Sequence, residues 1–459
     1  MAKENKTKRF ITHLRLVVIL VIAASLLVPV PLAGAGFLGR AIRCDAKVEL
    51  PRIRDILSRR RIADLSRRKI ADLSRIVVVG DSLSAGFQNG SLLDAQQVNG
   101  YASVVTDQAG GPLPLPLIGA PGIPNVLTLA DIGPPPVIVP APGSSPGRTN
   151  PLTQPLNLAV PGHTAEDALT TRPAFLFDNL TDFVLGLPGA FSGISRSQVE
   201  WAEALAPTTI LMWLGSNDVL AAAIEADASL VTPLPDFEAA YEEVIDRLAA
   251  TGAPMVVANI PDVTVVPFLT SFEEVAAAIG LSPDVLGLIL GIGPGDFVTP
   301  DAFDLISDIL GGVISGPLPG DVVLDAAEVA EIRAATDAFN AVIAEQAAAK
   351  GAALVDIHAF TNCLDTKGYL VGGQRLTTDF LGGIFSLDGI HPTNTGYALI
   401  ANEFIKKLNT HFRAGISRVS IAEVAESDPL VLPGVGRPAA ALRSLAEEIV
   451  ERLRTVLVP

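Results

Sequence analysis

The chain has 459 residues, and 49% of them are apolar, so its composition allows a large buried core. It carries 33 Lys and Arg against 49 Asp and Glu, which gives a formal net charge of −16. Such an acidic chain repels phosphate backbones, so we expect no nucleic acid among its partners.

The N-terminus has the pattern of an export signal. A leader with five Lys and Arg precedes the apolar run Leu16–Val28, which is too short to span a membrane comfortably. Two prolines end the run, and the small residues at 33–35 offer a cleavage site. We expect residues 1–35 to be a cleaved signal peptide and the protein to be secreted or periplasmic. An uncleaved anchor that extends to Leu38 is the alternative.

A basic linker with a short tandem repeat is expected over residues 36–75. The repeat occupies 58–73, and the stretch 51–75 holds nine Arg or Lys against three Asp. A basic amphipathic helix touching a membrane surface would fit this charge, but we favour a solvated linker. The chain has two cysteines, Cys44 and Cys363, without zinc-ligand spacing, and the sequence leaves open whether they pair.

From residue 76 onward, short apolar runs bounded by turn residues alternate with helical stretches. Such runs are typical of buried parallel strands, and the alternation predicts an α/β domain with helices on both faces of one sheet. The five expected strands are Ile76–Val79, Leu156–Val160, Thr208–Leu214, Met255–Ile260 and Ala353–Ile357. The main expected helices are Asp236–Ala250, Asp325–Lys350 and about Gly396–Thr410.

Two long insertions interrupt this alternation, at about 95–150 and at 262–322. Residues 110–150 contain eleven Pro and seven Gly, too many for regular elements. The second insertion is apolar, with short helical pieces at Phe272–Ile279 and Ala302–Leu310. After the domain, which we place at 76–412, residues 413–459 form a linker and a candidate helix, Ala439–Val456.

Four motifs carry candidate chemistry; the first three follow expected strands, and the fourth lies on a loop before the last helix. In VVVGDSLSAG (77–86), Ser82 comes directly after the first strand, where α/β sheets place their sites. This is not the G-x-S-x-G elbow of α/β-hydrolases, and Gly-Asp-Ser alone is also an ordinary turn. In NLAVPGHT (157–164), Gly162 allows close approach of a ligand to its N–H, or simply turns the chain into a helix. His163 is interpreted as a neighbouring turn residue.

The third and fourth motifs are MWLGSNDVL (212–220) and FSLDGIHPTNTGY (385–397). Asn217 has a side-chain amide that suits a developing oxyanion, but it also suits a helix cap, as does Asp218. Asp388 and His391 lie three apart on one loop, where a carboxylate can orient a histidine base. The remaining histidines of the domain, His358 and His411, are interpreted as structural or solvated.

Taken together, GDSL, NxAxxG, GxND and DxxHP resemble, in order, the block pattern of the GDSL esterase/lipases, also called SGNH hydrolases, over about residues 76–410. The resemblance implies a flavodoxin-like three-layer α/β/α domain with five parallel strands. It implies a catalytic triad of Ser82, His391 and Asp388, with an oxyanion hole formed by Ser82, Gly162 and Asn217. It also implies carboxylic ester hydrolysis through an acyl-enzyme, without a metal or other cofactor.

The substrate is less evident than the chemistry. Sugar platforms need Trp or Tyr, which are scarce here, whereas the 262–322 insertion is rich in aliphatic residues and suits an acyl-chain pocket or lid. We therefore expect a small-molecule or lipid ester with an apolar acyl group. An acyltransferase on the same triad and a non-catalytic surface-binding module are the alternatives.

The insertion at 262–322 follows the fourth strand, so we expect it beside the carboxyl ends of the strands. Its segments Phe272–Ile279 and Val285–Ile292 are too apolar to remain in water as free loops. A lid over the substrate is one interpretation, and a satellite core without a catalytic role is the other.

Overall fold

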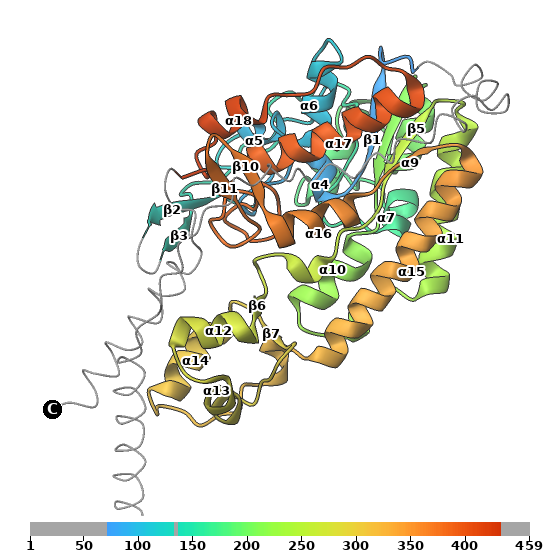
Figure 1. Ribbon diagram of the computed structural model, residues 1–459. Coiled ribbons are helices and arrows are strands. Elements are labelled where there is room, and N and C mark those ends of the chain that lie inside the picture. The colour runs from blue at the N-terminus through green and yellow to red at the C-terminus, as the bar shows by residue number, and fades with distance from the viewer. Residues whose placement is uncertain (1–70, 133–135, 433–459) are drawn as a thin grey trace, which may run out of the picture. The chain divides into compact units, whose positions relative to one another are not determined.

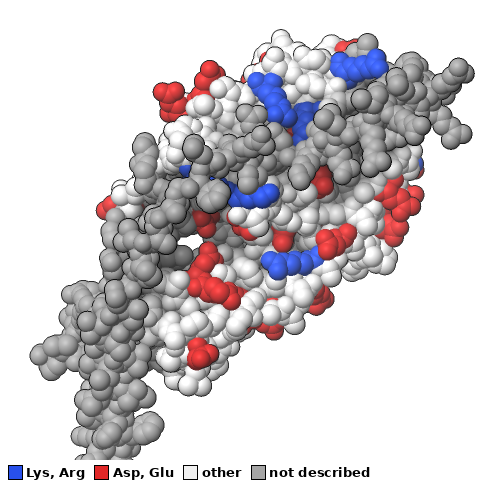
Figure 2. All heavy atoms as spheres, viewed as in Figure 1, with Lys and Arg blue, Asp and Glu red and all other residues white. Residues whose placement is uncertain are grey.

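The computed structural model describes residues 71–132 and 136–432. The leader, the tandem repeat up to residue 70 and the candidate helix at 439–456 lie outside the described residues. Among the described helices, none combines the length and apolarity needed to cross a membrane. Acidic side chains are spread over the visible face, with basic side chains between them (Figure 2).

Four parallel strands form the central sheet, in the order β1-β4-β5-β9. They are β1 (Ile76–Gly80), β4 (Thr209–Trp213), β5 (Met255–Ala258) and β9 (Ala353–Val355). Every residue of the first three strands is buried, as expected for apolar runs covered on both faces. The prediction of a parallel α/β sheet is confirmed for these four strands.

The segment 156–160, predicted to be a full strand, lies beside β1 without becoming one. Val78 and Gly80 exchange backbone hydrogen bonds with it, but only one isolated parallel bridge forms, between Val78 and Asn157. Gln198 explains this, because Gly80 N, which would donate to Leu158 O in a continued ladder, donates instead to Gln198 Oε1 at 3.0 Å. A side chain that accepts from a strand-end N–H thus replaces a ladder bond.

Helices cover both faces of the sheet, which gives three layers (Figure 1). Alternate residues of β4 enter the two cores: Ile210 and Met212 face one, and Leu211 and Trp213 face the other. The first core contains α7 (Ala165–Thr170), α9 (Gln198–Ala204), α10 (Asn217–Ile224), α11 (Leu234–Ala250) and α15 (Ala326–Lys350). The second contains α6 (Tyr101–Gln108), α16 (Ile357–Lys367) and α17 (Asn394–Phe412).

The predicted long helices are present with nearly the expected bounds. Helix α15 begins after Asp325, whose carboxylate accepts from Ala327 N and Glu328 N in a capping box. It ends at Gly351, which has φ 66°. Cys363, on α16, is disulfide-bonded, and Cys44 lies outside the described residues.

The first insertion contains a hairpin that the sequence did not predict. Strands β2 (Leu127–Asp131) and β3 (Val137–Pro140) pair antiparallel, although prolines and glycines surround them. The hairpin forms because successive side chains of a strand point to opposite faces, so that apolar side chains at alternate positions share one face. On that face Leu127, Leu129 and Ile138 pack on a small cluster formed by Leu381, Leu387 and Leu430. The expectation of no regular element over 110–150 was therefore wrong.

The second insertion gathers in a lobe around its own core (Figure 1). It has α12 (Phe272–Ile279), α13 (Pro283–Leu290) and α14 (Ala302–Leu310). A small antiparallel sheet, β6 (Thr270–Ser271), β7 (Phe297–Val298) and β8 (Val323–Leu324), closes the lobe. The two helices that the sequence predicted have the predicted bounds.

The segment after α17 is folded against the domain over its described part. Helix α18 (Ile421–Ser427) begins at Ser420, whose hydroxyl accepts from Glu423 N. Asp428 accepts from Thr395 N at 2.7 Å, at the start of α17. The expected linker after residue 412 is thus structured as far as these contacts extend.

Candidate active site

The turn after β1 places Ser82 at the carboxyl edge of the sheet, where it is buried. Asp81 is the N-cap of the short helix α4 (Ser82–Ala85), and its side chain accepts from Leu83 N at 3.0 Å. Gly80 is required where the strand ends, because a Cβ there would collide with the side chain of Ser84 and lie 2.7 Å from the carbonyl oxygen of Trp213. The strand and cap together fix the position of the Ser82 hydroxyl.

Ser82, His391 and Asp388 lie in one hydrogen-bonded chain. The distance from Ser82 Oγ to His391 Nε2 is 2.8 Å, and that from His391 Nδ1 to Asp388 Oδ2 is 3.0 Å. The last two residues share a loop that is closed by Ser386 N donating to His391 O at 2.8 Å. The structure therefore brings together three residues that span 309 positions of sequence.

Several donors hold the Asp388 carboxylate. Oδ1 accepts from His391 N at 2.8 Å and from Ile390 N at 2.9 Å, and Oδ2 accepts from Gly90 N at 2.7 Å. Burial opposes the charged form, but the neighbouring His391 and the N–H donors outweigh it and keep the pKa of Asp388 below its usual value. A negative charge is thus fixed behind the imidazole.

Residues 87–90 support this loop, and the sequence analysis missed them. Asn89 Oδ1 accepts from Leu387 N at 2.9 Å, and Asn89 N donates to Ser386 Oγ at 2.9 Å. The ring of Phe87 lies 4.7 Å from that of His391. The Asn-Gly dipeptide at 89–90 was a signal for a turn with positive φ, and Asn89 has φ 52°.

The structure places the three predicted oxyanion residues at adjoining turns. Gly162 has φ 86°, and a Cβ there would meet nothing within 4 Å, so the turn conformation is what requires glycine. Asn217 Nδ2 donates to the carbonyl oxygen of His163 at 2.9 Å, which fastens the third motif to the second. Among the described residues, none accepts a hydrogen bond from the backbone N–H of Ser82 or of Gly162.

A buried polar chain joins the first two motifs. Gln198 Oε1 accepts from Gly80 N at 3.0 Å, and its Nε2 lies 3.0 Å from His163 Nδ1. His163 Nε2 lies 3.0 Å from Thr181 Oγ1. Burial lowers the pKa of His163 to about 4, so the ring is neutral and accepts from Gln198 through Nδ1. His163 is therefore a structural link, whereas Gln198 carried no motif that would have revealed it.

Two more carboxyls are buried beside the nucleophile turn. Burial raises the pKa of Asp81 to about 7, and its Oδ2 has no hydrogen-bond partner in the described part of the chain. Burial also raises the pKa of Asp218 to about 6. Asp218 was expected to cap its own helix, but Ser216 holds the N-cap position of α10. The carboxylate of Asp218 instead accepts a hydrogen bond from Ala165 N at 3.1 Å, at the start of α7.

A narrow crevice of about 60 Å³ opens at Ser82 and His391, and we call it the Ser82 crevice. Its wall is mostly apolar and includes Val265, Val266 and Thr378. Within the described ranges, no group of His, Cys, Asp and Glu side chains is placed to hold a metal ion. The arrangement supplies a hydroxyl, a base and an anion in line, next to N–H donors that have no acceptor.

The family model for GDSL-like Lipase/Acylhydrolase matches residues 76–404, more than half of the chain. The chain belongs to this family. The GDSL family comprises carboxylic ester hydrolases, which confirms the resemblance that the four motifs carried. A search among curated proteins finds no similar sequence.

Solved structures similar to this GDSL protein include three ester-cleaving enzymes. The psychrotrophic esterase EstA from Pseudoalteromonas is 14% identical, over 73% of this chain and 96% of that chain, with a TM-score of 0.31. A mutant acetyl-xylooligosaccharide esterase from Geobacillus is 13% identical, over 74% of this chain and 96% of that chain, with a TM-score of 0.33. An extracellular lipase from Streptomyces rimosus is 16% identical, over 73% of this chain and 98% of that chain, with a TM-score of 0.28. At these values the likenesses carry no information on substrate.

Proposed function

We propose that this protein is an exported serine ester hydrolase in which Ser82 is the nucleophile. The observation that carries the proposal is the hydrogen-bonded chain from Ser82 Oγ through His391 to Asp388. With Asp388 accepting at Nδ1, the lone pair of Nε2 faces the Ser82 hydroxyl, as a general base requires. The fixed charge of Asp388 then stabilises the imidazolium that forms.

The reaction proceeds in two halves. His391 takes the Ser82 proton as Oγ attacks the ester carbonyl, and it returns that proton to the leaving alcohol. Water then attacks the acyl-enzyme in the same way and releases the acid. The N–H groups of Ser82 and Gly162 and the second amide hydrogen of Asn217 are the donors for the oxyanion, each worth about 3 kcal/mol.

The proposed acyl group is apolar, because the Ser82 crevice and the adjoining part of the second insertion present mainly aliphatic and aromatic walls. The test is a series of p-nitrophenyl esters and acetylated sugars, with Ser82→Ala as the blank. Hydrolysis of the acetylated sugars alone would contradict the acyl assignment and leave the nucleophile assignment intact.

Export is the further part of the proposal, and it depends on the leader at 1–35. Expression in a bacterial host should yield a protein outside the cytoplasm whose N-terminus begins near residue 36. N-terminal sequencing of that fraction tests it, and an intact leader on cytoplasmic protein would contradict it.

A further inference from the structure

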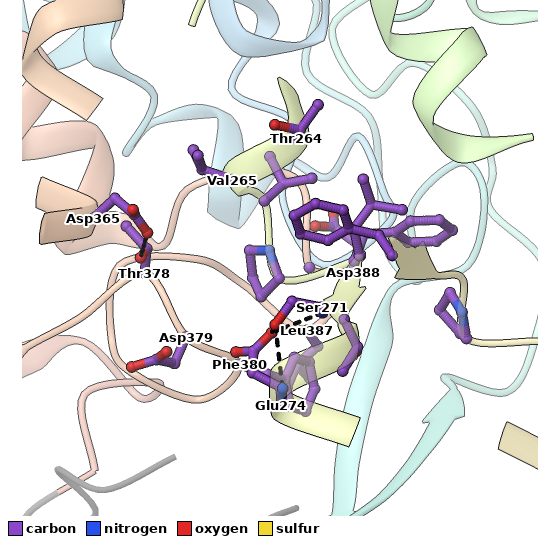
Figure 3. A pocket seen from close by; sticks show the side chains of 18 of the residues that line it. Thr264, Val265, Ser271, Glu274, Asp365, Thr378, Asp379, Phe380, Leu387 and Asp388 are labelled. Atoms are coloured by element: carbon purple, nitrogen blue, oxygen red, sulfur yellow. Dashed lines mark hydrogen bonds between the residues drawn. The ribbon is translucent and has the colours of Figure 1, made fainter. Parts of the chain in front are cut away.

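A cavity of about 670 Å³ lies where both insertions meet the loop that carries Asp388 (Figure 3). We call it the side cavity. The second insertion contributes residues 264–271 and Phe303, the hairpin of the first contributes Ile138, and the loop contributes 387–389. Phe268 N donates to Gly389 O at 2.9 Å, so the insertion is fastened directly to the loop. A volume of this size is typical of small-molecule sites.

The side cavity adjoins the Ser82 crevice. Val265, Val266 and Thr378 line both. Most of the remaining wall is apolar, from Pro136, Phe268, Leu269, Phe297, Pro300 and Phe380. A chain attached to a carbonyl at Ser82 therefore has an apolar space next to it, larger than the crevice itself.

The charged groups of the side cavity are predominantly acidic. Glu274 on α12, Asp365 on α16 and Asp379 contribute carboxylates to its lining (Figure 3). Arg333 is the one basic residue among the described lining residues, and it is engaged with Asp262 Oδ2 at 3.2 Å and with Thr264 Oγ1 at 3.0 Å. The lining thus holds an excess of negative charge beside an apolar wall.

We propose that the side cavity binds the acyl chain of the ester and selects uncharged chains over chains that end in an anion. This proposal rests on the esterase function proposed above. The apolar wall favours a longer chain, by about fourfold for each methylene that it buries. The carboxylates disfavour a terminal anion, by about tenfold if two of them lie roughly 6 Å away and are screened as in water.

The experiment measures kcat/KM of the purified full chain on three p-nitrophenyl esters: acetate, hexanoate and hydrogen adipate. The last two have acyl chains of the same length, and only the adipate ends in a carboxylate. We expect hexanoate to exceed acetate by at least tenfold, and hexanoate to exceed adipate by about tenfold at low ionic strength.

Two pairs of variants locate these effects. Ile138→Trp fills the side cavity from β3, whereas Val139→Trp changes the next residue of the same strand, which does not line it. Asp379→Lys reverses a charge in the lining, and Glu331→Lys reverses the charge of an exposed residue of α15 outside it. We expect Ile138→Trp to lower the hexanoate rate at least fivefold with acetate unchanged, and Asp379→Lys to abolish the discrimination against adipate. Both control variants should resemble the wild type.

The outcomes separate this proposal from the esterase function. Acetate hydrolysis that is lost in Ser82→Ala, together with equal rates on acetate and hexanoate, would overturn the side-cavity proposal alone. The side-cavity proposal would also be overturned if Val139→Trp changed the rates as Ile138→Trp does, or if Glu331→Lys changed them as Asp379→Lys does. Acetates of longer alcohols provide a further comparison. If kcat/KM rises with the length of the alcohol and not with that of the acyl chain, the assignment of the side cavity to the acyl chain is wrong. Absence of any Ser82-dependent hydrolysis would overturn the esterase function itself.

Discussion

Replacing Asn217 by alanine distinguishes an oxyanion donor from a structural asparagine. The Nδ2 group donates to the carbonyl oxygen of His163 at 2.9 Å, and Ser216, not Asn217, occupies the N-cap position of α10. Loss of that bond costs about 1 kcal/mol of stability. The alanine recovers part of this, because it is the better helix former by about 0.6 kcal/mol. Loss of the oxyanion donor costs about 3 kcal/mol in the transition state, a hundredfold or more in kcat.

The assay is kcat on p-nitrophenyl acetate together with urea unfolding of the same preparations. Asn402→Ala is the control, since Asn402 is also a helical asparagine whose Nδ2 donates to a backbone carbonyl, that of Val419 at 3.1 Å. Its Oδ1 also accepts from Val419 N at 3.0 Å, so its replacement breaks two hydrogen bonds where that of Asn217 breaks one. We expect the control to lose stability and keep kcat, and Asn217→Ala to do the reverse. If the two variants behave alike, Asn217 is a structural residue and the oxyanion assignment fails.

Three further predictions concern buried groups around the nucleophile. Gln198→Leu leaves the Gly80 N–H and His163 Nδ1 without their partner, and urea unfolding should show a loss of about 2 to 6 kcal/mol; a loss under 1 kcal/mol would contradict the link. Asp388→Asn should lower kcat by about 10⁴, because an amide neither stabilises the imidazolium nor holds its tautomer, and a fall below tenfold would refute its role. Burial raises the pKa of Asp81 to about 7, so the folded protein retains a proton that the unfolded chain releases near pH 4. The contribution of Asp81 to stability should therefore fall by up to about 4 kcal/mol as pH rises from 4 to 7, and urea unfolding at pH 5 and 8 measures it as the difference between the wild type and Asp81→Asn, because His163 and Asp218 titrate alike in both proteins. An equal difference at the two pH values would contradict the raised pKa.

The parallel sheet and its long helices were predictable because each depends on local pattern. Short apolar runs buried on both faces mark β1 and β4, and the caps Asp325 and Gly351 mark the ends of α15. Strand pairing at 156–160 was not predictable to the same degree. The side chain of Gln198 takes the Gly80 N–H that would have continued the ladder, a competition that an apolar run does not reveal.

The four motif residues Ser82, Gly162, Asn217 and His391 could be proposed from sequence because their motifs occur in a known order, the first three at strand ends and the fourth on the loop before the last helix. The residues that support them could not be proposed in this way. Gln198 lies on a helix without any motif, and only the fold brings it between Gly80 and His163. The side cavity was equally hidden, since a proline-rich hairpin, an apolar insertion and the Asp388 loop build it from distant parts of the chain.

Covalent labelling tests directly whether Ser82 is the nucleophile. The purified protein is treated with a fluorophosphonate, and the modified residue is located by peptide mass spectrometry, in parallel with Ser82→Ala. We expect one label per chain, on Ser82, and a Ser82→Ala protein that unfolds like the wild type yet neither takes the label nor hydrolyses p-nitrophenyl acetate. A label on another residue, or hydrolysis by Ser82→Ala within tenfold of the wild type, would contradict it.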